Sequence, residues 1–485
     1  MRPKVRKLRP LAAAVAALAL LAAPGAAAQG YDDSGYDAGY DDTSQAGYDS
    51  GYSYLRNLRG SATLVEGDSG DREAVEINQP LLAGDRLWVS PGSMAEVLLA
   101  DGNLLRVDGD SEVVLARLAA SPESRDEVTE LVLVEGNAQL VVFADAAGRE
   151  LPRIELPNGT VYVQEPGAYR LTAGRGWSQV LARDGWAEVA TDRGSVVVRG
   201  GEEALIEDRG GADVRVASYQ DDLERWGERL DRDVADTRYV DRSLAREAAI
   251  LDDYGSWIDD GGRHVWRPRV DRDWQPYRHG RWTHTPLGVT WVSSEPWGWA
   301  PYHYGTWNLH PRHGWVWYPG TAFAPAWVYW YWGPSHVAWV PIGYYTHHYR
   351  PFYGHRFGFH FGTYGWAGGH WGLYNDWVFC PTGYFGRPFG SRHFWRGSDW
   401  RRHHRDDHVP RGIIAVDTRP LGRDEWRDSE KAMRALRSRP LQAAGRDGEL
   451  PDVTDFVARR QALPEPVARR VFVETGAERR LTGTP

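Results

Sequence analysis

The sequence Trp-Gln-Pro-Tyr-Arg-His-Gly-Arg-Trp at residues 274–282 returns 25 residues later as Trp-Ala-Pro-Tyr-His-Tyr-Gly-Thr-Trp at residues 299–307. Both copies follow the pattern Trp-x-Pro-Tyr-x-x-Gly-x-Trp, and Trp339-Val340-Pro341 is a partial third copy. Proline restricts φ and glycine permits a turn, so each copy predicts a turn that leads into short strands. The pattern therefore predicts a β-repeat domain in this part of the chain.

The repeats lie in an aromatic-rich segment, since 19 of the 24 tryptophans fall between Trp257 and Trp400. Buried rings would form a core, because each aromatic side chain hides about 150–250 Å² of surface. Exposed rings would instead form a platform that stacks on sugar faces or cationic groups. The sequence leaves both uses open.

If some of these rings bind a ligand, the candidates are Trp297, Trp299, Tyr302, Trp307, Trp315, Trp317, Trp330 and Trp332. Three pairs of tryptophans among them are two residues apart, a spacing that places both rings on one face of an extended strand. These pairs are Trp297/Trp299, Trp315/Trp317 and Trp330/Trp332.

The start of the chain predicts export. Residues 1–28 combine a basic opening, an apolar run and small residues before Gln29, as is typical of a secretory signal peptide. Residues 29–54 repeat Gly, Tyr and Asp without an apolar period, which predicts a disordered acidic tether. No later segment reaches the roughly 18 apolar residues of a spanning helix. We therefore expect a periplasmic protein, with surface or extracellular placement left open.

Residues 55–207 alternate short apolar runs with turn signals. Asp101-Gly102, Asn158-Gly159 and Asp184-Gly185 lie between such runs, and Asn or Asp before Gly supplies the positive φ of a tight hairpin. This texture predicts an antiparallel β domain.

The rest of the chain divides by composition. Leu223, Trp226, Leu230 and Val234 form one apolar stripe at helical spacing, which predicts a helical connector. The predicted segments are the connector at 217–254, the Trp/Pro-rich repeat domain at 255–350, a Gly/His/aromatic-rich segment at 351–410 and a charged, largely disordered tail at 411–485. The fold class is thus mainly β, with a helical connector between an antiparallel β domain and an aromatic-rich β-repeat domain.

Two runs in the β domain carry a family signature: Pro80-Leu81-Leu82-Ala83-Gly84-Asp85-Arg86-Leu87 and Ala95-Glu96-Val97-Leu98-Leu99. On these residues, residues 55–207 resemble the FecR-type domain of bacterial envelope proteins. The resemblance implies a compact β structure on the periplasmic side. In the family's regulatory members this domain relays a receptor signal to an extracytoplasmic sigma factor. This chain departs from those members, because its sequence shows neither a cytoplasmic segment nor a spanning helix.

Further signatures accompany the two repeats: Trp266-Arg267-Pro268, Thr290-Trp291-Val292, Glu295-Pro296-Trp297-Gly298 and Phe323-Ala324-Pro325-Ala326-Trp327. With them, residues 240–350 resemble a domain of unknown function that often follows FecR-type domains in proteobacterial exported proteins. This resemblance implies a domain but no chemistry.

Charge is distributed unevenly along the chain. Residues 29–263 carry 23 Arg against 47 acidic residues, whereas residues 264–408 carry 14 Arg against 7. The basic segment suits either attraction to the acidic half or an anionic polymer. Nucleic acid is not an expected partner of an exported acidic chain.

No catalytic constellation stands out in the sequence. Glu295 is one of three acidic residues between Trp274 and Trp400, so the carboxylate pair of a glycoside hydrolase is not expected there. We expect Glu295 to pair with an arginine such as Arg281. The single cysteine, Cys380, has apolar neighbours and predicts a packed thiol. The histidine pairs at 347–348 and 403–404 lack the spacing of a zinc site, so no metal or cofactor is predicted.

These features predict an exported, non-enzymatic envelope protein that acts as a binding or scaffold module, with a cell-wall or surface polymer as the first candidate ligand. The alternative is a periplasmic signalling component that binds a partner protein through the FecR-like domain.

Overall fold

The computed structural model describes residues 52–119, 127–143, 150–207, 211–217, 220–231, 239–310, 312–341, 377–387, 390–403, 413–415, 418, 421–423 and 425–437. The predicted signal peptide and residues 29–51 of the predicted tether lie outside these ranges.

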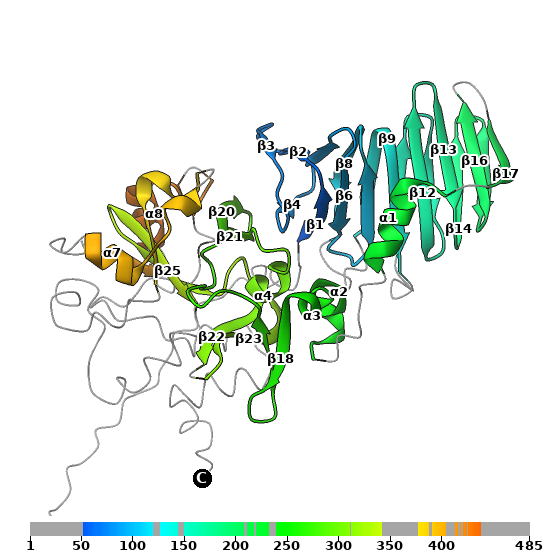
Figure 1. Cartoon of the computed structure of the whole chain (residues 1–485). Helices are drawn as coiled ribbons and strands as arrows, with labels where there is room; N and C mark the ends of the chain where they lie inside the picture. Colours follow the sequence, from blue (N-terminus) through cyan, green and yellow to red (C-terminus); the bar gives the residue numbers. More distant parts are fainter. Residues whose placement is uncertain are drawn as a thin grey trace, which may run out of the picture. The chain divides into compact units, whose positions relative to one another are not determined.

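The described part of residues 53–216 is a β domain (Figure 1). Its strands are β1 Ser53–Arg59, β2 Ala62–Val65, β3 Arg72–Ala74, β4 Pro80–Leu81, β5 Arg86–Val89, β6 Met94–Leu98, β7 Leu104–Asp108, β8 Ser111–Arg117, β9 Glu130–Val142, β10 Arg153–Leu156, β11 Gly159–Val163, β12 Gly167–Gly174, β13 Trp177–Ala182, β14 Trp186–Thr191, β15 Gly194–Arg199, β16 Glu202–Glu207 and β17 Ala212–Val216. The antiparallel β domain predicted from alternation and turn residues is confirmed.

These strands form two sheets that share β9. Sheet 1 has the order β4-β1-β6-β7-β9-β12-β13-β16-β17, and sheet 2 has the order β3-β2-β5-β8-β9-β10-β11-β14-β15. The chain changes sheet within β9 at Gly136, whose φ is 90°. A Cβ atom there would lie 2.2 Å from the Ser111 hydroxyl oxygen, so the crossing requires glycine.

The β domain is longer than predicted at both ends. Ser53 and Tyr54, assigned to the tether from sequence, belong to β1 and are buried. At the other end, β17 follows the predicted boundary at residue 207 and pairs with β16. Both additions satisfy backbone groups in the ladder of sheet 1.

The predicted helical connector is confirmed, and its described residues form four short helices: α1 Asp222–Asp231, η3 Arg242–Leu244, α2 Ala245–Ala248 and α3 Leu251–Tyr254. Leu223 and Trp226 of the predicted stripe pack on Met94 of the β domain, with Leu230 partly buried beside them. Val234 lies outside the described residues.

Ion pairs also hold α1 on sheet 1. Glu96, Arg106, Gln139 and Arg170 are direct neighbours across β6, β7, β9 and β12. Arg106 binds Glu96 at 2.8 Å within this row and also pairs with Asp231 at the end of α1. Buried charges need such partners, and the connector adds a second carboxylate to an arginine that Glu96 already pairs within the sheet.

The aromatic domain follows the connector. Its elements are β18 Gly255–Asp259, β19 His264–Pro268, β20 Gly280–Thr285, β21 Gly288–Ser293, α4 Trp299–His303, β22 Tyr304–His310, β23 Gly314–Phe323, β24 Val328–Trp332, β25 His336–Pro341, β26 Val378–Pro381, η5 Thr382–Tyr384, η6 Gly390–His393, β27 Trp395–Arg396, α7 Gly397–His403, β28 Ile413–Ala415 and α8 Ser429–Arg437. Each copy of the nine-residue pattern leads into an antiparallel hairpin, β20/β21 for the first and β22/β23 for the second. The strands predicted from the repeat are therefore confirmed.

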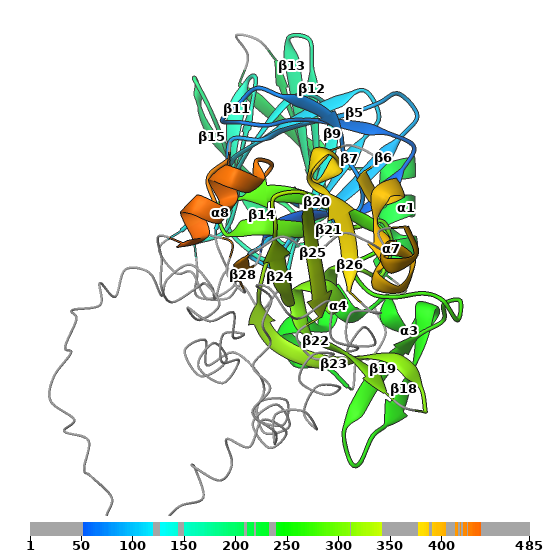
Figure 2. The ribbon, with the colours of Figure 1, turned by 90° about the vertical axis from the view of Figure 1, so that its left-hand side faces the viewer.

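The aromatic domain does not end at the predicted boundary of residue 350. Strands β24, β25 and β26 lie side by side (Figure 2), with β27 at one edge of this sheet and β28 at the other. Leu421 and Trp426, in the segment predicted to be a largely disordered tail, are buried in the same core. The helix α8 also lies in this segment. The few apolar side chains of this segment therefore pack in the core, although its charged composition predicted a largely disordered tail.

One hydrophobic core spans the two domains. It contains the buried tryptophans of the aromatic domain together with Tyr54, Leu98 and Leu104 of the β domain. A second core fills the space between the two β sheets. In the described ranges, no helix is long and apolar enough to cross a membrane.

Candidate functional site

All eight aromatic residues proposed as ligand-binding candidates lie in the interior. Trp297, Trp299, Tyr302, Trp307, Trp315, Trp317, Trp330 and Trp332 are each at most 7% exposed. The prediction that they form an exposed platform is wrong, because the rings pack on one another and on the β domain. The eight rings instead form part of a hydrophobic core, which was the alternative that the sequence left open.

The three predicted pairs behave differently. Trp330 and Trp332 lie in β24 with ring centroids 5.6 Å apart, as expected for one face of a strand. Trp315 and Trp317 likewise lie in β23. Trp297 and Trp299 do not share a strand, since the helix α4 begins at Trp299.

The two copies of the repeat meet through their tyrosines. The Tyr277 hydroxyl donates to the Tyr302 carbonyl at 2.9 Å, and the two rings are 4.7 Å apart. The Tyr302 hydroxyl in turn donates to Glu295 at 2.6 Å. The repeated Pro-Tyr pair therefore builds an internal contact between the copies.

Glu295 is the acidic centre of this contact. Its carboxylate accepts hydrogen bonds from the Trp274 indole at 2.5 Å, the Tyr302 hydroxyl at 2.6 Å and the Ser293 hydroxyl at 2.9 Å. Burial raises the pKa of Glu295 to about 7, although the three donors act in the opposite direction. The acid expected to pair with arginine is instead held by neutral donors.

Arg281 points to the β domain and not to Glu295. It donates to the Gln79 side chain at 2.9 Å and lies 3.3 Å from Glu73 and 3.5 Å from Glu76. The expected Glu295–Arg281 pair is therefore wrong. The acidic β domain instead supplies the partners of Arg281, in agreement with the attraction between the basic and acidic halves that the charge distribution left open.

The junction between the domains is built from specific contacts. Tyr54 stacks on Trp299 with centroids 3.9 Å apart and planes 7° apart. Asn78, buried and with a φ of 62°, donates to the carbonyls of Ser293 at 3.0 Å and Glu295 at 2.8 Å. Asparagine adopts the left-handed region more readily than most residues, and these two hydrogen bonds use that conformation to join the domains.

The position of Glu295 predicts a pH-dependent stability. Its pKa exceeds the ordinary 4.5 by about 2.5 (7 − 4.5) in the folded chain. Between pH 4.5 and 7 the fold keeps a proton that the unfolded chain has released, so this group's contribution to stability falls as pH rises through that window. The full cost, roughly 3 kcal/mol, is present above pH 7.

We expect Glu295→Gln to remove this cost, so that the variant gains stability relative to the native chain at pH 8 but not at pH 4.5. Urea unfolding at both pH values measures the difference. Comparison with the native chain is needed because burial lowers the pKa of His303 to about 4, which gives stability that is lost as pH falls from 6.5 toward 4. An equal change in stability at both pH values contradicts the assignment.

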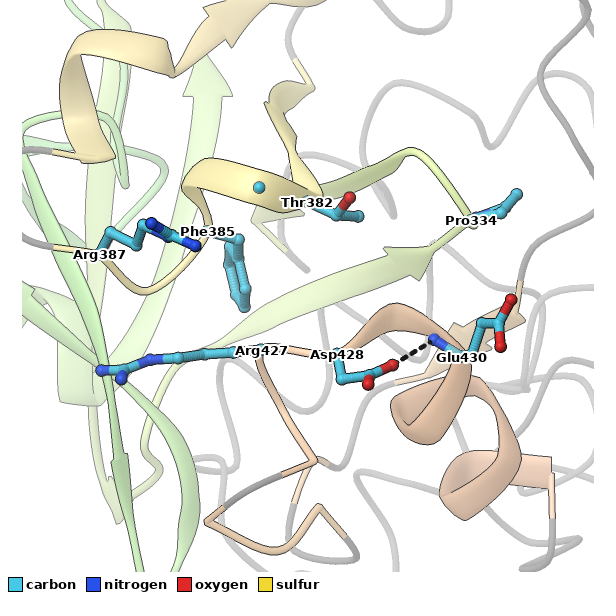
Figure 3. A pocket seen from close by; sticks show the side chains of 8 residues that line it. Pro334, Thr382, Phe385, Arg387, Arg427, Asp428 and Glu430 are labelled. Carbon is cyan, nitrogen blue, oxygen red and sulfur yellow. Dashed lines mark hydrogen bonds between the residues drawn. The ribbon is translucent and has the colours of Figure 1, made fainter.

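A shallow pocket of about 290 Å³ lies in the aromatic domain between η5 and the start of α8 (Figure 3). It is lined by Pro334, Thr382, Gly383, Phe385, Arg387, Arg427, Asp428 and Glu430. In Figure 3 the guanidinium groups of Arg387 and Arg427 lie on one side of Phe385, and the carboxylates of Asp428 and Glu430 lie on the other.

Positive charge dominates the arginine side of this pocket. Arg387 and Arg427 are both exposed. Arg427 is exposed as a residue, but partial desolvation of its guanidinium, together with the nearby guanidinium groups of Arg281 and Arg387, lowers its pKa. The Asp428 carboxylate accepts the backbone N–H groups of Glu430 at 3.0 Å and Lys431 at 3.1 Å, so it caps α8. An anionic group is the natural ligand for the two arginines.

Sequence reasoning did not find this pocket, because its arginines come from the two segments assigned to a Gly/His/aromatic-rich stretch and a tail. One signal was available. Trp426 is the only tryptophan after Trp400, and a disordered acidic or basic tail rarely carries such a ring. In the structure Trp426 is buried, and Arg427 lies over its ring at 4.8 Å.

Other candidate groups are enclosed or lie outside the structure. The Cys380 thiol is buried, which raises its pKa to about 12, as suits a packed residue. Among the described residues no three His, Cys, Asp or Glu side chains gather as metal ligands. His347, His348 and His404 lie outside the described ranges.

Comparison with known proteins identifies one segment. Residues 248–347 match the model of DUF6600, a family of unknown function. This match confirms the domain of unknown function predicted for residues 255–350. No family match supports the FecR-type resemblance of residues 55–207, which stays a prediction. No curated protein matches the chain.

Two crystal structures of a candidate anti-sigma factor from Parabacteroides distasonis ATCC 8503 resemble part of the chain. The first has a TM-score of 0.24 and 18% identity, covering 30% of this chain and 64% of the other. The second has a TM-score of 0.24 and 15% identity, covering 38% of this chain and 99% of the other. The chain thus spans less than two thirds of the first structure, and TM-scores this low support no conclusion about function.

Proposed function

We propose that this chain is an exported, non-enzymatic module of the cell envelope that binds an anionic envelope polymer through Arg387 and Arg427. The signal-peptide pattern of residues 1–28 supports export. The pocket between η5 and α8 supports binding, and it is the single observation on which the choice of ligand rests.

The geometry of the pocket suits a charged group of a polymer. Two exposed guanidinium groups line one side and the carboxylates of Asp428 and Glu430 line the other, so an anion would be held at the side of the arginines. The volume of about 290 Å³ admits a group of roughly the size of one sugar unit. Arginine presents a planar fork of donors that matches carboxylate and phosphate oxygens. The buried Phe385 ring supports the pocket wall and is not itself a stacking surface.

The absence of enzymatic activity is part of the proposal. Glu295, the acid with the most perturbed environment in the aromatic domain, already accepts three hydrogen bonds and caps an internal contact. Its surroundings are those of a structural acid. Arg387 and Arg427 can hold an anion, and neither supplies a base or a nucleophile at neutral pH.

Co-sedimentation with isolated peptidoglycan sacculi and outer-membrane fractions tests the proposal. We expect the purified chain to pellet at low salt and less at high salt, because exposed charge pairs are screened. The double variant Arg387→Gln with Arg427→Gln should lose at least about tenfold in affinity, since each charged hydrogen bond contributes on the order of 1.5–3 kcal/mol. Glutamine keeps part of the apolar stem but removes the guanidinium that lies over Trp426, so the fold of the variant is checked by circular dichroism.

The matched control is Arg267→Gln with Arg312→Gln, two exposed arginines of the same domain outside the pocket. The control should pellet like the native chain, because it keeps both pocket arginines, although its net charge equals that of the pocket variant. Equal loss in both variants would mean that the binding is nonspecific and that the pocket is not the site.

A second candidate function has its own observation. Tyr162 and Trp186 of the β domain are 38% and 37% exposed, and both side chains stand on the outer face of sheet 2. Aromatic residues on an open sheet face suit a protein partner, as the signalling alternative requires. If the native chain fails to pellet in every condition, this second candidate replaces polymer binding.

A further inference from the structure

The last strand of sheet 1 is an open edge. In the described part of the chain, β17 pairs only with β16. Val216 is 80% exposed, the largest exposure among the exposed large hydrophobic side chains. Ala212 and Val214 pack only partly on the β-domain core. Native edge strands are usually shortened, charged or covered, so an apolar residue this exposed calls for an explanation.

Alternate residues of β17 have backbone groups that bond to no other described residue. Just beyond the strand, the Ala217 N–H donates to the Gly201 carbonyl at 2.9 Å. An antiparallel ladder alternates the direction of these groups. The N–H and C=O groups of Asp213 and Arg215 therefore point to β16, and those of Ala212, Val214 and Val216 point away from it.

The side chains of β17 are complementary to themselves. In an antiparallel pair of two β17 strands centred on Val214, Asp213 of each strand lies opposite Arg215 of the other, and Ala212 lies opposite Val216. Val214 lies opposite its own copy. Each Asp213–Arg215 pair can form a salt bridge between the two strands. The apolar residues lie on the face of the sheet that turns to the core, where Ala212 and Val214 already pack.

Hydrogen-bond direction agrees with this register. Because Val214 points its N–H and C=O outward, the central pair and the two Ala212/Val216 pairs exchange about six backbone hydrogen bonds. Asp213 and Arg215 then occupy the intervening positions, where opposite side chains approach most closely. Arg215 keeps its present partner, since Glu203 lies 2.5 Å away on the neighbouring strand.

We propose that two copies of this chain associate through an antiparallel β17–β17 contact centred on Val214, which joins the two copies of sheet 1 into one continuous sheet. The occupant of the open edge is thus a second copy of the chain. The contact is short and depends on concentration.

Sedimentation velocity of the purified full chain over a range of concentrations tests this proposal. We expect a monomer–dimer equilibrium for the native chain. Asp213→Arg places two positive charges in each strand, and Arg215→Asp places two negative charges, so each variant alone repels its own copy. Each should weaken dimerisation about tenfold or more.

Mixing the two variants provides the decisive measurement. The positive strand of Asp213→Arg complements the negative strand of Arg215→Asp in the same register, so the mixture should regain dimers. Arg215→Asp places its new carboxylate beside Glu203 and can weaken the strand itself. Val214→Pro is therefore a further variant, because it removes an outward N–H at the centre without removing a bond to β16.

The control is Glu155→Arg, an exposed strand residue of sheet 2 with the same change in charge as Asp213→Arg. It should dimerise like the native chain. A native chain that stays monomeric at every attainable concentration overturns the proposal. Dimers that persist in both Asp213→Arg and Val214→Pro overturn it as well.

Discussion

Gly305→Ala is expected to destabilise the chain by more than about 3 kcal/mol. Gly305 has a φ of 72° and lies where the pairing of β22 with β23 shifts register. A Cβ atom there would lie 2.1 Å from the Tyr318 carbonyl oxygen and 2.7 Å from the Gly320 nitrogen. Both neighbours are backbone atoms, so relief requires separating the strands. The left-handed conformation adds roughly 1–2 kcal/mol for any residue with a Cβ.

Thermal and urea unfolding followed by circular dichroism measure this loss. The matched control is Gly314→Ala in the turn of the same hairpin. Gly314 has almost the same φ, 71°, but a Cβ atom added there would meet no other atom within 4 Å. The control should lose only the conformational part, about 1 kcal/mol. If both variants lose the same amount, close backbone approach is not what requires glycine in the repeat.

Trp282→Ala is expected to destabilise the chain by about 3–5 kcal/mol, because it deletes a fully buried tryptophan side chain from the core. Trp282 is 1% exposed, and its ring centroid lies 4.3 Å from Trp330, 4.8 Å from Trp291 and 5.2 Å from Trp339. Its indole N–H has no hydrogen-bond partner among the described residues. The loss is therefore one of packing alone.

Trp282→Phe separates these contributions. Phenylalanine keeps part of the ring packing and removes the buried N–H group, whose lack of a partner costs free energy. We expect Trp282→Phe to lose less than half as much stability as Trp282→Ala. Trp177→Ala, at a ring that is 38% exposed, should stay within about 1 kcal/mol of the native chain. Equal losses for Trp282→Ala and Trp177→Ala would refute the central role of Trp282.

The shared core has a consequence for experiments with fragments. Tyr54 and Leu98 of the β domain pack among the tryptophans, and Asn78 holds the carbonyls of Ser293 and Glu295. Deleting the β domain therefore removes part of the aromatic core. Point variants on the surface distinguish the two candidate functions more cleanly than a deletion of residues 55–207.

The candidate site was only partly predictable from sequence. The types of residue were right, since Glu295 is a buried acid and Arg281 does form ion pairs. The predicted partners were wrong. Arg281 pairs with Glu73 and Glu76, which precede it by about 200 residues in the sequence, and such a contact depends on how the domains pack. The arginine pocket was missed for the same reason, since β24–β25, η5 and the approach to α8 meet only in the fold.

The sequence by itself determined the local structure. Alternating apolar residues, Asp-Gly and Asn-Gly turns and the repeated Gly-x-Trp predicted an antiparallel β domain and two hairpins, because strand period and turn geometry depend on neighbouring residues. Only the tertiary structure decided which rings are exposed, which acid meets which base, and that β28 and Trp426 complete the aromatic domain. The burial of a side chain and the partner of a charge both depend on residues that are distant in sequence and that only the fold brings close. A tryptophan that packs in a core and one that binds a ligand therefore have the same sequence pattern.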